Sequence, residues 1–215
     1  MSVIRQPGLF GRHTRRRVVG VTAAAGAATL EAVAVGLWFT LVVVETRTAA
    51  AALAGLGILF CGALLRLGIF GAATAPVQVL LTPRRIATML TLVAAWPLWI
   101  LLAERIDGVL GLTVAGILLG LVLTVQFVLE CRVFRLPESR RCYATAALAG
   151  GLVALGASIL LASAWFTNWT VLTEPFVVGD TALIFRIEAY QLGILVFGAF
   201  AFLAHQRRFQ QTLEP

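Results

Sequence analysis

The sequence has no lysine, three cysteines, two histidines and few charged side chains of any kind. Charged residues make up 13% of its 215 positions, against about 25% in an ordinary soluble domain, which excludes that class. Cys61, Cys131 and Cys142 lack CxxC spacing and predict free thiols rather than a redox or zinc motif. His13 and His205 lie outside the long apolar segments, so we expect no intramembrane ligand for a haem or metal ion and no cofactor.

The motifs of common enzyme classes are also missing. The sequence has no HExxH, GxSxG or Walker pattern, and no acidic cluster suited to a metal-dependent lipid transferase. It has four serines, and Ser163, which lies in an apolar segment, has no nearby histidine or lysine to activate it. We therefore predict no catalytic residue and no metal site, and a lipid-modifying enzyme is the least favoured function.

Six long apolar segments dominate what is present, and the mean hydropathy is +0.95. A helix needs roughly 20 apolar residues to cross the hydrocarbon core of a bilayer, and a helix satisfies its own backbone there. The sequence predicts an all-α, polytopic membrane bundle of six transmembrane helices, with the lipid bilayer as its surroundings. The expected segments are a basic arm (1–17), a transmembrane domain (18–204) with spans 18–44, 49–74, 85–103, 108–130, 143–166 and 182–204, and a tail (205–215).

The arginines are unevenly distributed between the expected connections. Thirteen of the seventeen lie in the arm, at 84–85, in 132–141 and at 207–208, whereas the opposite connections hold Arg47 and Arg105. Because cytoplasmic connections are the arginine-rich ones, both termini are expected in the cytoplasm. Membrane topology thus explains the net charge of +7 without nucleic acid as a partner. We predict a multi-pass protein of a prokaryotic plasma membrane.

The tryptophans gather toward the other side of the expected bilayer. Trp38, Trp96, Trp99, Trp165 and Trp169 fall in or near the outer halves of their spans. Tryptophan is enriched at membrane–water interfaces. The pattern therefore predicts an interfacial aromatic belt.

The first candidate site is an intramembrane polar pair. Glu31 lies in the middle of the first span, where an ionised carboxylate costs at least about 2.5 kcal/mol unless it is compensated. Arg66 lies on the returning span, within reach of an arginine side chain, so an ion pair in the bundle interior is expected. Gln126 on the fourth span is an accessory candidate. The pair either fixes how two helices dock or contacts a proton, an ion or a polar solute.

The second candidate lies at the outer start of the last expected span. Arg186 and Tyr190 are four residues apart, and Glu188 and Gln191 are three apart, which places them on neighbouring faces of a helix. They would line an outward-facing vestibule. The alternative is that this turn lies in the headgroup layer, which tolerates charge and tyrosine.

The third feature is a seam of small side chains at four-residue spacing in the fifth span, and such seams let helices approach closely in lipid. A shorter stretch on the fourth span repeats it. The seam packs either within the chain or against another subunit. Its members are Ala146, Gly150, Ala154, Ser158 and Ala162, with Gly116 and Gly120 on the fourth span.

Two weaker patterns concern repeats and modification. Leu37-Trp38 and Ala54-Gly55 recur at a constant offset as Leu98-Trp99 and Ala115-Gly116, and Leu56-Gly57-Ile58-Leu59 recurs as Leu192-Gly193-Ile194-Leu195. Together these matches suggest three hairpin repeats, although such common residues also match by chance. Asn168 begins the sequon Asn-Trp-Thr on the expected outer side, which makes it a candidate for glycosylation.

These observations favour an integral membrane subunit that acts through helix–helix association, as an accessory or structural part of a larger complex. Its partners would be other membrane subunits or a second copy. The alternative is a small-solute or ion transporter or channel that uses Glu31 and Arg66. A polar cavity reaching Glu31 would favour transport, and a closed pair would favour a scaffold.

Overall fold

The structure is a computed structural model that describes residues 12–45, 47–74, 83–133, 140–178 and 181–213. Most of the basic arm and part of the 132–141 segment lie outside the described residues. Helices account for 87% of the structure, and six are long and apolar enough to cross a membrane. They are α1 (Arg12–Phe39), continued by the π-helical turn η1 (Thr40–Val44), α2 (Ala49–Thr74), α3 (Pro83–Ile106), α4 (Gly108–Val133), α5 (Arg140–Trp165) and α6 (Ala189–Leu213).

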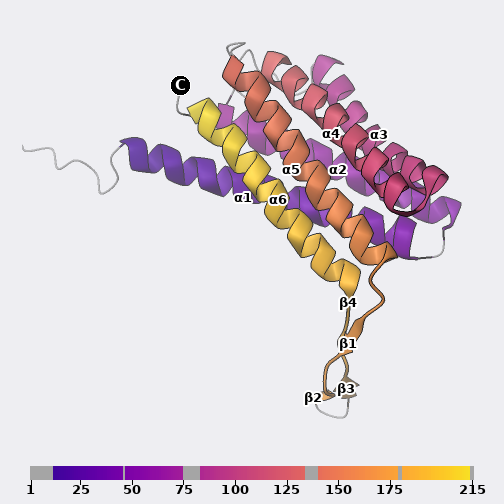
Figure 1. Cartoon of the computed structure of the whole chain (residues 1–215). Coiled ribbons are helices and arrows are strands. Elements are labelled where there is room, and N and C mark those ends of the chain that lie inside the picture. The colour runs from indigo at the N-terminus through magenta and orange to yellow at the C-terminus, as the bar shows by residue number, and fades with distance from the viewer. Residues whose placement is uncertain (1–11, 46, 75–82, 134–139, 179–180, 214–215) are drawn as a thin grey trace, which may run out of the picture.

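The helices form one bundle in which consecutive helices are neighbours. Helix α5 packs between α4 and α6, α1 packs against α6 and α2, and α3 packs against α4. Helices α2 and α3 share far fewer contacts. Figure 1 shows the helices side by side, with the strands projecting from one end. Short connections favour this antiparallel arrangement, because the chain can reverse only into an adjacent position.

Two connections at the strand-bearing end are held by polar side chains. Asp107 alone separates α3 from α4 and has a positive φ of 64°, and its Oδ1 accepts a hydrogen bond of 2.7 Å from the Gly108 amide. Aspartate is among the few residues that tolerate this conformation. Arg47, between η1 and α2, donates from Nη1 to Glu104 Oε2 of α3 at 2.8 Å. The ends of α1, α2 and α3 are thereby tied together.

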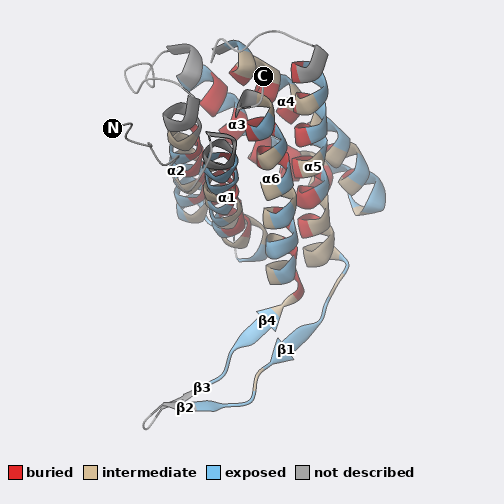
Figure 2. Ribbon diagram, turned by 90° about the vertical axis from the view of Figure 1, so that its left-hand side faces the viewer, coloured by how far each residue is buried: buried red, intermediate tan, exposed pale blue. Residues whose placement is uncertain are grey.

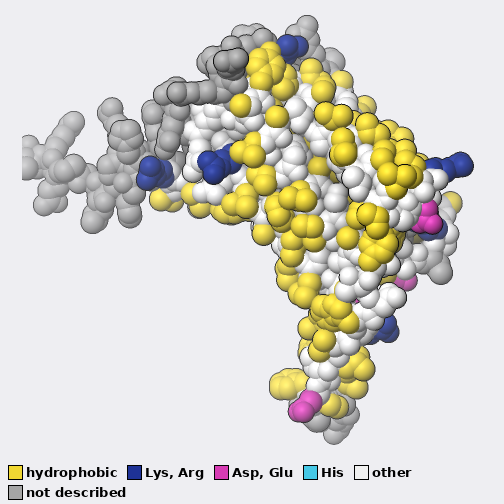
Figure 3. Space-filling view, in the orientation of Figure 1, with side chains coloured by type: hydrophobic (Ala, Val, Ile, Leu, Met, Phe, Trp, Pro, Cys, Tyr) yellow, Lys and Arg dark blue, Asp and Glu magenta, His cyan; other side chains and the backbone are white. Residues whose placement is uncertain are grey.

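The core at this end is aromatic, which corrects the prediction of an interfacial belt for three of its five tryptophans, whereas Trp165 is half-buried and Trp169 is exposed. Trp38, Trp96 and Trp99 are each at most 2% exposed. The Trp96 ring centroid lies 6.3 Å from that of Trp38, 5.8 Å from that of Trp99 and 5.7 Å from that of Phe197. Position along a span does not show which way a side chain points, and these three point inward. Leucine and valine side chains instead cover much of the outer face of the bundle (Figure 3).

The segment before α6 is extended rather than helical, which corrects the predicted span 182–204. Strand β1 (Thr170–Leu172) pairs antiparallel with β4 (Arg186–Glu188), and β2 (Phe176–Val178) pairs with β3 (Thr181–Leu183). We call residues 170–178 and 181–188 the ribbon. It projects beyond the helices and is largely exposed (Figure 2). Aromatic and β-branched residues favour strands, and pairing with β1 supplies the backbone hydrogen bonds.

Helix α6 begins at Ala189 and ends at Leu213, so it includes residues that were expected in a cytoplasmic tail. Its start is defined by Gln191, whose Oε1 accepts a hydrogen bond of 3.2 Å from the Glu188 amide. A glutamine or glutamate side chain at the third helical position that accepts from the amide of the residue before the helix forms one of the two hydrogen bonds of a capping box. Because α6 continues past residue 204, His205 lies inside the bundle.

The small-residue seam on α5 packs against α4 of the same chain. A Cβ added at Gly150 would lie 2.6 Å from Thr124 Oγ1 and 2.8 Å from the Thr124 amide nitrogen. A Cβ added at Gly116 would lie 2.5 Å from Ser158 Oγ, and one added at Gly120 would lie 3.4 Å from Ala154 Cβ. Both small-residue stretches therefore belong to one internal interface.

Gly150→Ala should destabilise the bundle by about 1–3 kcal/mol, the usual cost of overpacking a tight interface. The neighbouring change Gly151→Ala is the matched control, because its added Cβ meets nothing within 4 Å. Thermal unfolding of the two variants in the same detergent measures the difference. Equal melting temperatures would show that α4 and α5 do not approach this closely.

Candidate functional site

The site is a network of charged and amide side chains buried among α1, α2, α4 and α6. On α1, Glu31 is 5% exposed, and on α2, Arg66 is 7% exposed. Arg66 Nη1 lies 3.6 Å from Glu31 Oε1, so the structure places the two predicted residues beside each other. The other carboxylate oxygen of Glu31 lies 2.6 Å from Nε2 of His205, which is 1% exposed.

Glu130 of α4 lies at the centre of the network. Arg66 Nη2 donates to its Oε1 at 2.9 Å, and Arg208 Nη2 of α6 donates to its Oε2 at 2.5 Å. Gln126, one turn earlier on α4, donates from Nε2 to Glu130 Oε1 at 3.3 Å and to the Thr88 carbonyl of α3 at 2.6 Å. One carboxylate thus joins three helices directly and a fourth through an amide.

An aromatic ring completes the surroundings of the two guanidinium groups. The Phe127 ring lies under the Arg208 guanidinium, 4.1 Å from its central carbon, and 5.7 Å from that of Arg66. Cations over a ring face are stabilised by its quadrupole, the more so when water is excluded. Phe127 and Glu130 are three residues apart, so one face of α4 supplies both the ring and the carboxylate.

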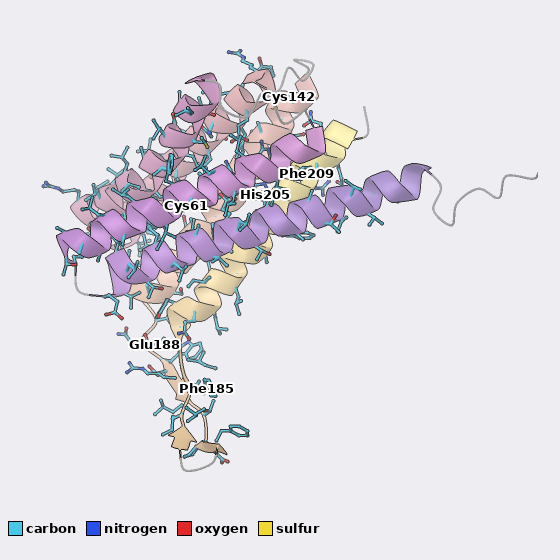
Figure 4. All side chains as sticks on the ribbon, turned by 180° about the vertical axis from the view of Figure 1, so that it is seen from behind. Cys61, Cys142, Phe185, Glu188, His205 and Phe209 are labelled. Carbon is cyan, nitrogen blue, oxygen red and sulfur yellow. The ribbon has the colours of Figure 1, made fainter. Side chains whose placement is uncertain are left out.

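Sequence reasoning found Glu31, Arg66 and Gln126 but not Glu130, His205 and Arg208. Glu130 was the last residue of an expected span, and the other two were assigned to the tail. The usable signal was spacing, since Gln126 and Glu130 are four residues apart and His205 and Arg208 three apart, each pair on one helix face. Figure 4 shows the outcome for His205, which lies within the bundle on α6.

The network leaves some of its hydrogen-bonding capacity unused. Within the described residues, four of its atoms have no hydrogen-bond partner: Glu31 Oε1, Arg66 Nη1, Gln126 Oε1 and His205 Nδ1. A cavity of about 20 Å³ between α1, α2 and α3 is lined by Glu31 and Arg66 among apolar side chains. A second, of about 10 Å³, is lined by Arg66, Glu130, His205 and Arg208. Each has room for about one water molecule.

The outer candidate residues are divided between the ribbon and α6. Arg186 Nε lies 2.7 Å from Glu188 Oε1 on β4. Both line a pocket of about 340 Å³ together with Tyr190 and Asn168, whereas Gln191 caps the helix. Arg186 and Glu188 therefore lie on a strand, and only Tyr190 and Gln191 lie on a helix as predicted, although three of the four residues share one pocket. Asn168 is exposed, and its glycosylation stays a prediction.

Comparison of the chain with protein-family models, with curated proteins and with solved structures finds no match. In the part of the chain that the structure describes, histidine, cysteine, aspartate and glutamate side chains form no group of three suited to a metal ion. Within the described residues, Cys61, Cys131 and Cys142 form no disulfide.

Removing one partner of a buried ion pair costs about 3–5 kcal/mol, because the remaining charge loses its compensation. Arg208→Gln should therefore destabilise the bundle by this amount, since it removes one of the two arginines on Glu130. Arg207→Gln is the matched control. Arg207 is exposed, so its replacement should change the free energy of unfolding by less than about 0.5 kcal/mol. Thermal unfolding in detergent compares the two, and similar losses would contradict a specific role of Glu130 and Arg208.

Proposed function

We propose that this chain is an accessory subunit of a larger membrane complex and that the ribbon contacts a partner protein. The observation that carries the proposal is the exposure of large apolar side chains outside the helical bundle. Leu172 is 65% exposed, Phe176 64% and Phe185 59%. Contiguous exposed apolar surface of this kind marks interaction sites in proteins.

The structure of the ribbon supports contact with a protein. An isolated two-stranded sheet is marginally stable in water, and each sheet of the ribbon has only two strands. Unpaired strand edges can accept a strand from another chain. Apolar side chains lie on both faces, because Val171 and Ile187 form one cross-strand pair and Leu172 belongs to the next. A partner that covers the ribbon would stabilise it.

The small-residue seam on α5 does not supply the contact with a partner protein. It faces α4 of the same chain, as the approach of Gly150 to Thr124 shows. The accessory role is therefore proposed on the ribbon rather than on helix–helix association through the seam. A second copy of the chain and a different membrane subunit are both candidate partners.

We further propose that both termini are cytoplasmic in a prokaryotic plasma membrane and that the ribbon lies outside. Arg17, Arg132 and Arg207 lie near the ends of α1, α4 and α6 that are opposite the ribbon. Arginine is enriched on the cytoplasmic side of membrane proteins. The hairpins α1–α2, α3–α4 and α5–α6 are each neighbours, but their descent from one repeat stays a prediction.

Transport of a small solute or ion through the Glu31–Arg66 pair is the second candidate. Glu31 Oε1 and Arg66 Nη1, which form an ion pair without a hydrogen bond, and the sparse contact between α2 and α3 favour it. However, the cavity at the pair holds only about 20 Å³, the size of one water molecule. The accessory role is favoured because this cavity has no space for a solute larger than a water molecule.

Replacing Leu172 and Phe176 together by serine should reduce the partner-bound share of the protein by at least about tenfold, since each buried interface anchor contributes more than about 1 kcal/mol. Protein purified from its native membranes would be weighed by native mass spectrometry, which gives the partner's mass and stoichiometry. Glu174→Gln, an exposed polar change in the same ribbon, is the control and should keep the complex intact. A wild-type chain that is monomeric in native membranes would refute the accessory role.

The orientation predicts accessibility to a membrane-impermeant maleimide. In a variant that lacks Cys61, Cys131 and Cys142, Glu174→Cys should be labelled in intact cells, whereas Gln210→Cys should be labelled only after permeabilisation. Both positions are exposed, so burial does not explain a difference. Labelling of both residues from the same side would contradict the orientation.

A further inference from the structure

The buried network contains one acid–imidazole pair, Glu31 and His205, in which the second oxygen of the carboxylate and the second nitrogen of the ring have no hydrogen-bond partner among the described residues. Glu31 Oε2 and His205 Nε2 lie 2.6 Å apart, a hydrogen-bond distance at which one of the two atoms carries a proton. Glu31 Oε1 and His205 Nδ1 have no hydrogen-bond partner among the described residues. The pair therefore holds one proton and offers a further acceptor atom at each of its two ends.

The charges around the pair determine where an additional proton is tolerated. The groups that face it are Arg66 of α2, Glu130 of α4 and Arg208 of α6. Glu130 accepts from both arginines, so protonating Glu130 would weaken two ion pairs. Protonating Glu31 leaves Arg66 hydrogen bonded to Glu130. The geometry therefore favours proton uptake at Glu31 and His205 over uptake at Glu130.

Two small cavities lie on either side of the pair. The one of about 10 Å³ is lined by His205 and Arg208, and lies toward the end where α6 finishes. The one of about 20 Å³ begins at Glu31 and extends along α1 to Val35, toward the strand-bearing end. Each has space for about one water molecule, which can deliver a proton but excludes a solute.

We propose that Glu31 and His205 form a proton-binding site that exchanges protons with the arginine-rich end of the bundle. A proton from water binds His205 Nδ1, and the proton on Nε2 moves to Glu31 Oε2. The imidazole is neutral before and after, and Glu31 becomes a carboxylic acid. Imidazole suits this step because it takes a proton on one nitrogen and releases one from the other.

Proton uptake changes the charge balance between helices. In the unloaded state two carboxylates balance the guanidinium groups of Arg66 and Arg208. In the loaded state Glu31 is neutral, so α1 loses its charge attraction to Arg66 on α2. Acids and histidines inside membranes commonly serve as proton relays. This site is independent of the ribbon, so failure of one proposal leaves the other standing.

The test is nuclear magnetic resonance of nitrogen-15-labelled histidine in lipid nanodiscs. His13→Gln leaves His205 as the only histidine in the sequence. We expect Nδ1 to be unprotonated at neutral pH and to bind one proton reversibly on acidification. In the His13→Gln/Glu31→Gln variant this step should move to lower pH by about one unit, or about tenfold in proton affinity, because no carboxylate accepts the Nε2 proton. Glu104→Gln, an acid outside the network, is the control and should leave it unchanged.

Two outcomes would overturn the proposal. The first is an Nδ1 signal that does not change over the whole pH range in which the protein stays folded. The second is an unchanged titration in the Glu31→Gln variant. If the Glu31→Gln variant does not fold, the test uses the chain in which only His13 is replaced. In that chain the infrared band of a protonated carboxyl group should grow on acidification with the same midpoint pH as the Nδ1 titration. A carboxyl band that does not follow the Nδ1 signal would then count against the site.

Discussion

Glu130 accepts hydrogen bonds from Arg66 and Arg208 in the buried interior of the bundle, and the arrangement of the helices depends on this contact. A charge at this depth is tolerated only beside an opposite charge. The two arginines therefore hold α2 and α6 against α4. Glu31 adds α1 through Arg66 and His205, and Gln126 adds α3 through the Thr88 carbonyl. A small number of polar atoms thus joins five of the six helices of the bundle.

The two ends of the molecule differ in what they leave exposed. The ionic network is closed, with unused hydrogen-bonding capacity on Glu31 and His205 and space only for water. The ribbon exposes apolar side chains on both faces beyond the lipid-facing helices. The interior is therefore suited to hold helices together and to bind a proton, and the ribbon is suited to contact a protein. This division separates the two proposals physically and lets each be tested alone.

The errors of sequence reasoning have a common cause. Hydropathy ends a span at its first charged residues, so the last span was placed too early and His205 and Arg208 were assigned to the tail. In the bundle these side chains lie buried on α6, because Glu130 and Glu31 supply the opposite charges from other helices. The prediction for Trp38, Trp96 and Trp99 failed for a related reason, since depth along a span does not define which face of the helix a residue occupies. Trp96 lies at the right depth for an interface and is nevertheless 2% exposed.

The sequence by itself determined the membrane class, the number of long helices and the need of Glu31 for a cationic partner, because these follow from local hydropathy and from the cost of a lone charge in lipid. The sequence also identified the small-residue seam, but it did not identify the helix against which the seam packs. Only the tertiary structure decided that the seam faces α4, that four short strands (β1 to β4) precede α6, and that Glu130, His205 and Arg208 join Glu31 and Arg66. These features depend on which helix faces meet and on pairing between distant segments, and neither is encoded in the composition of any one segment.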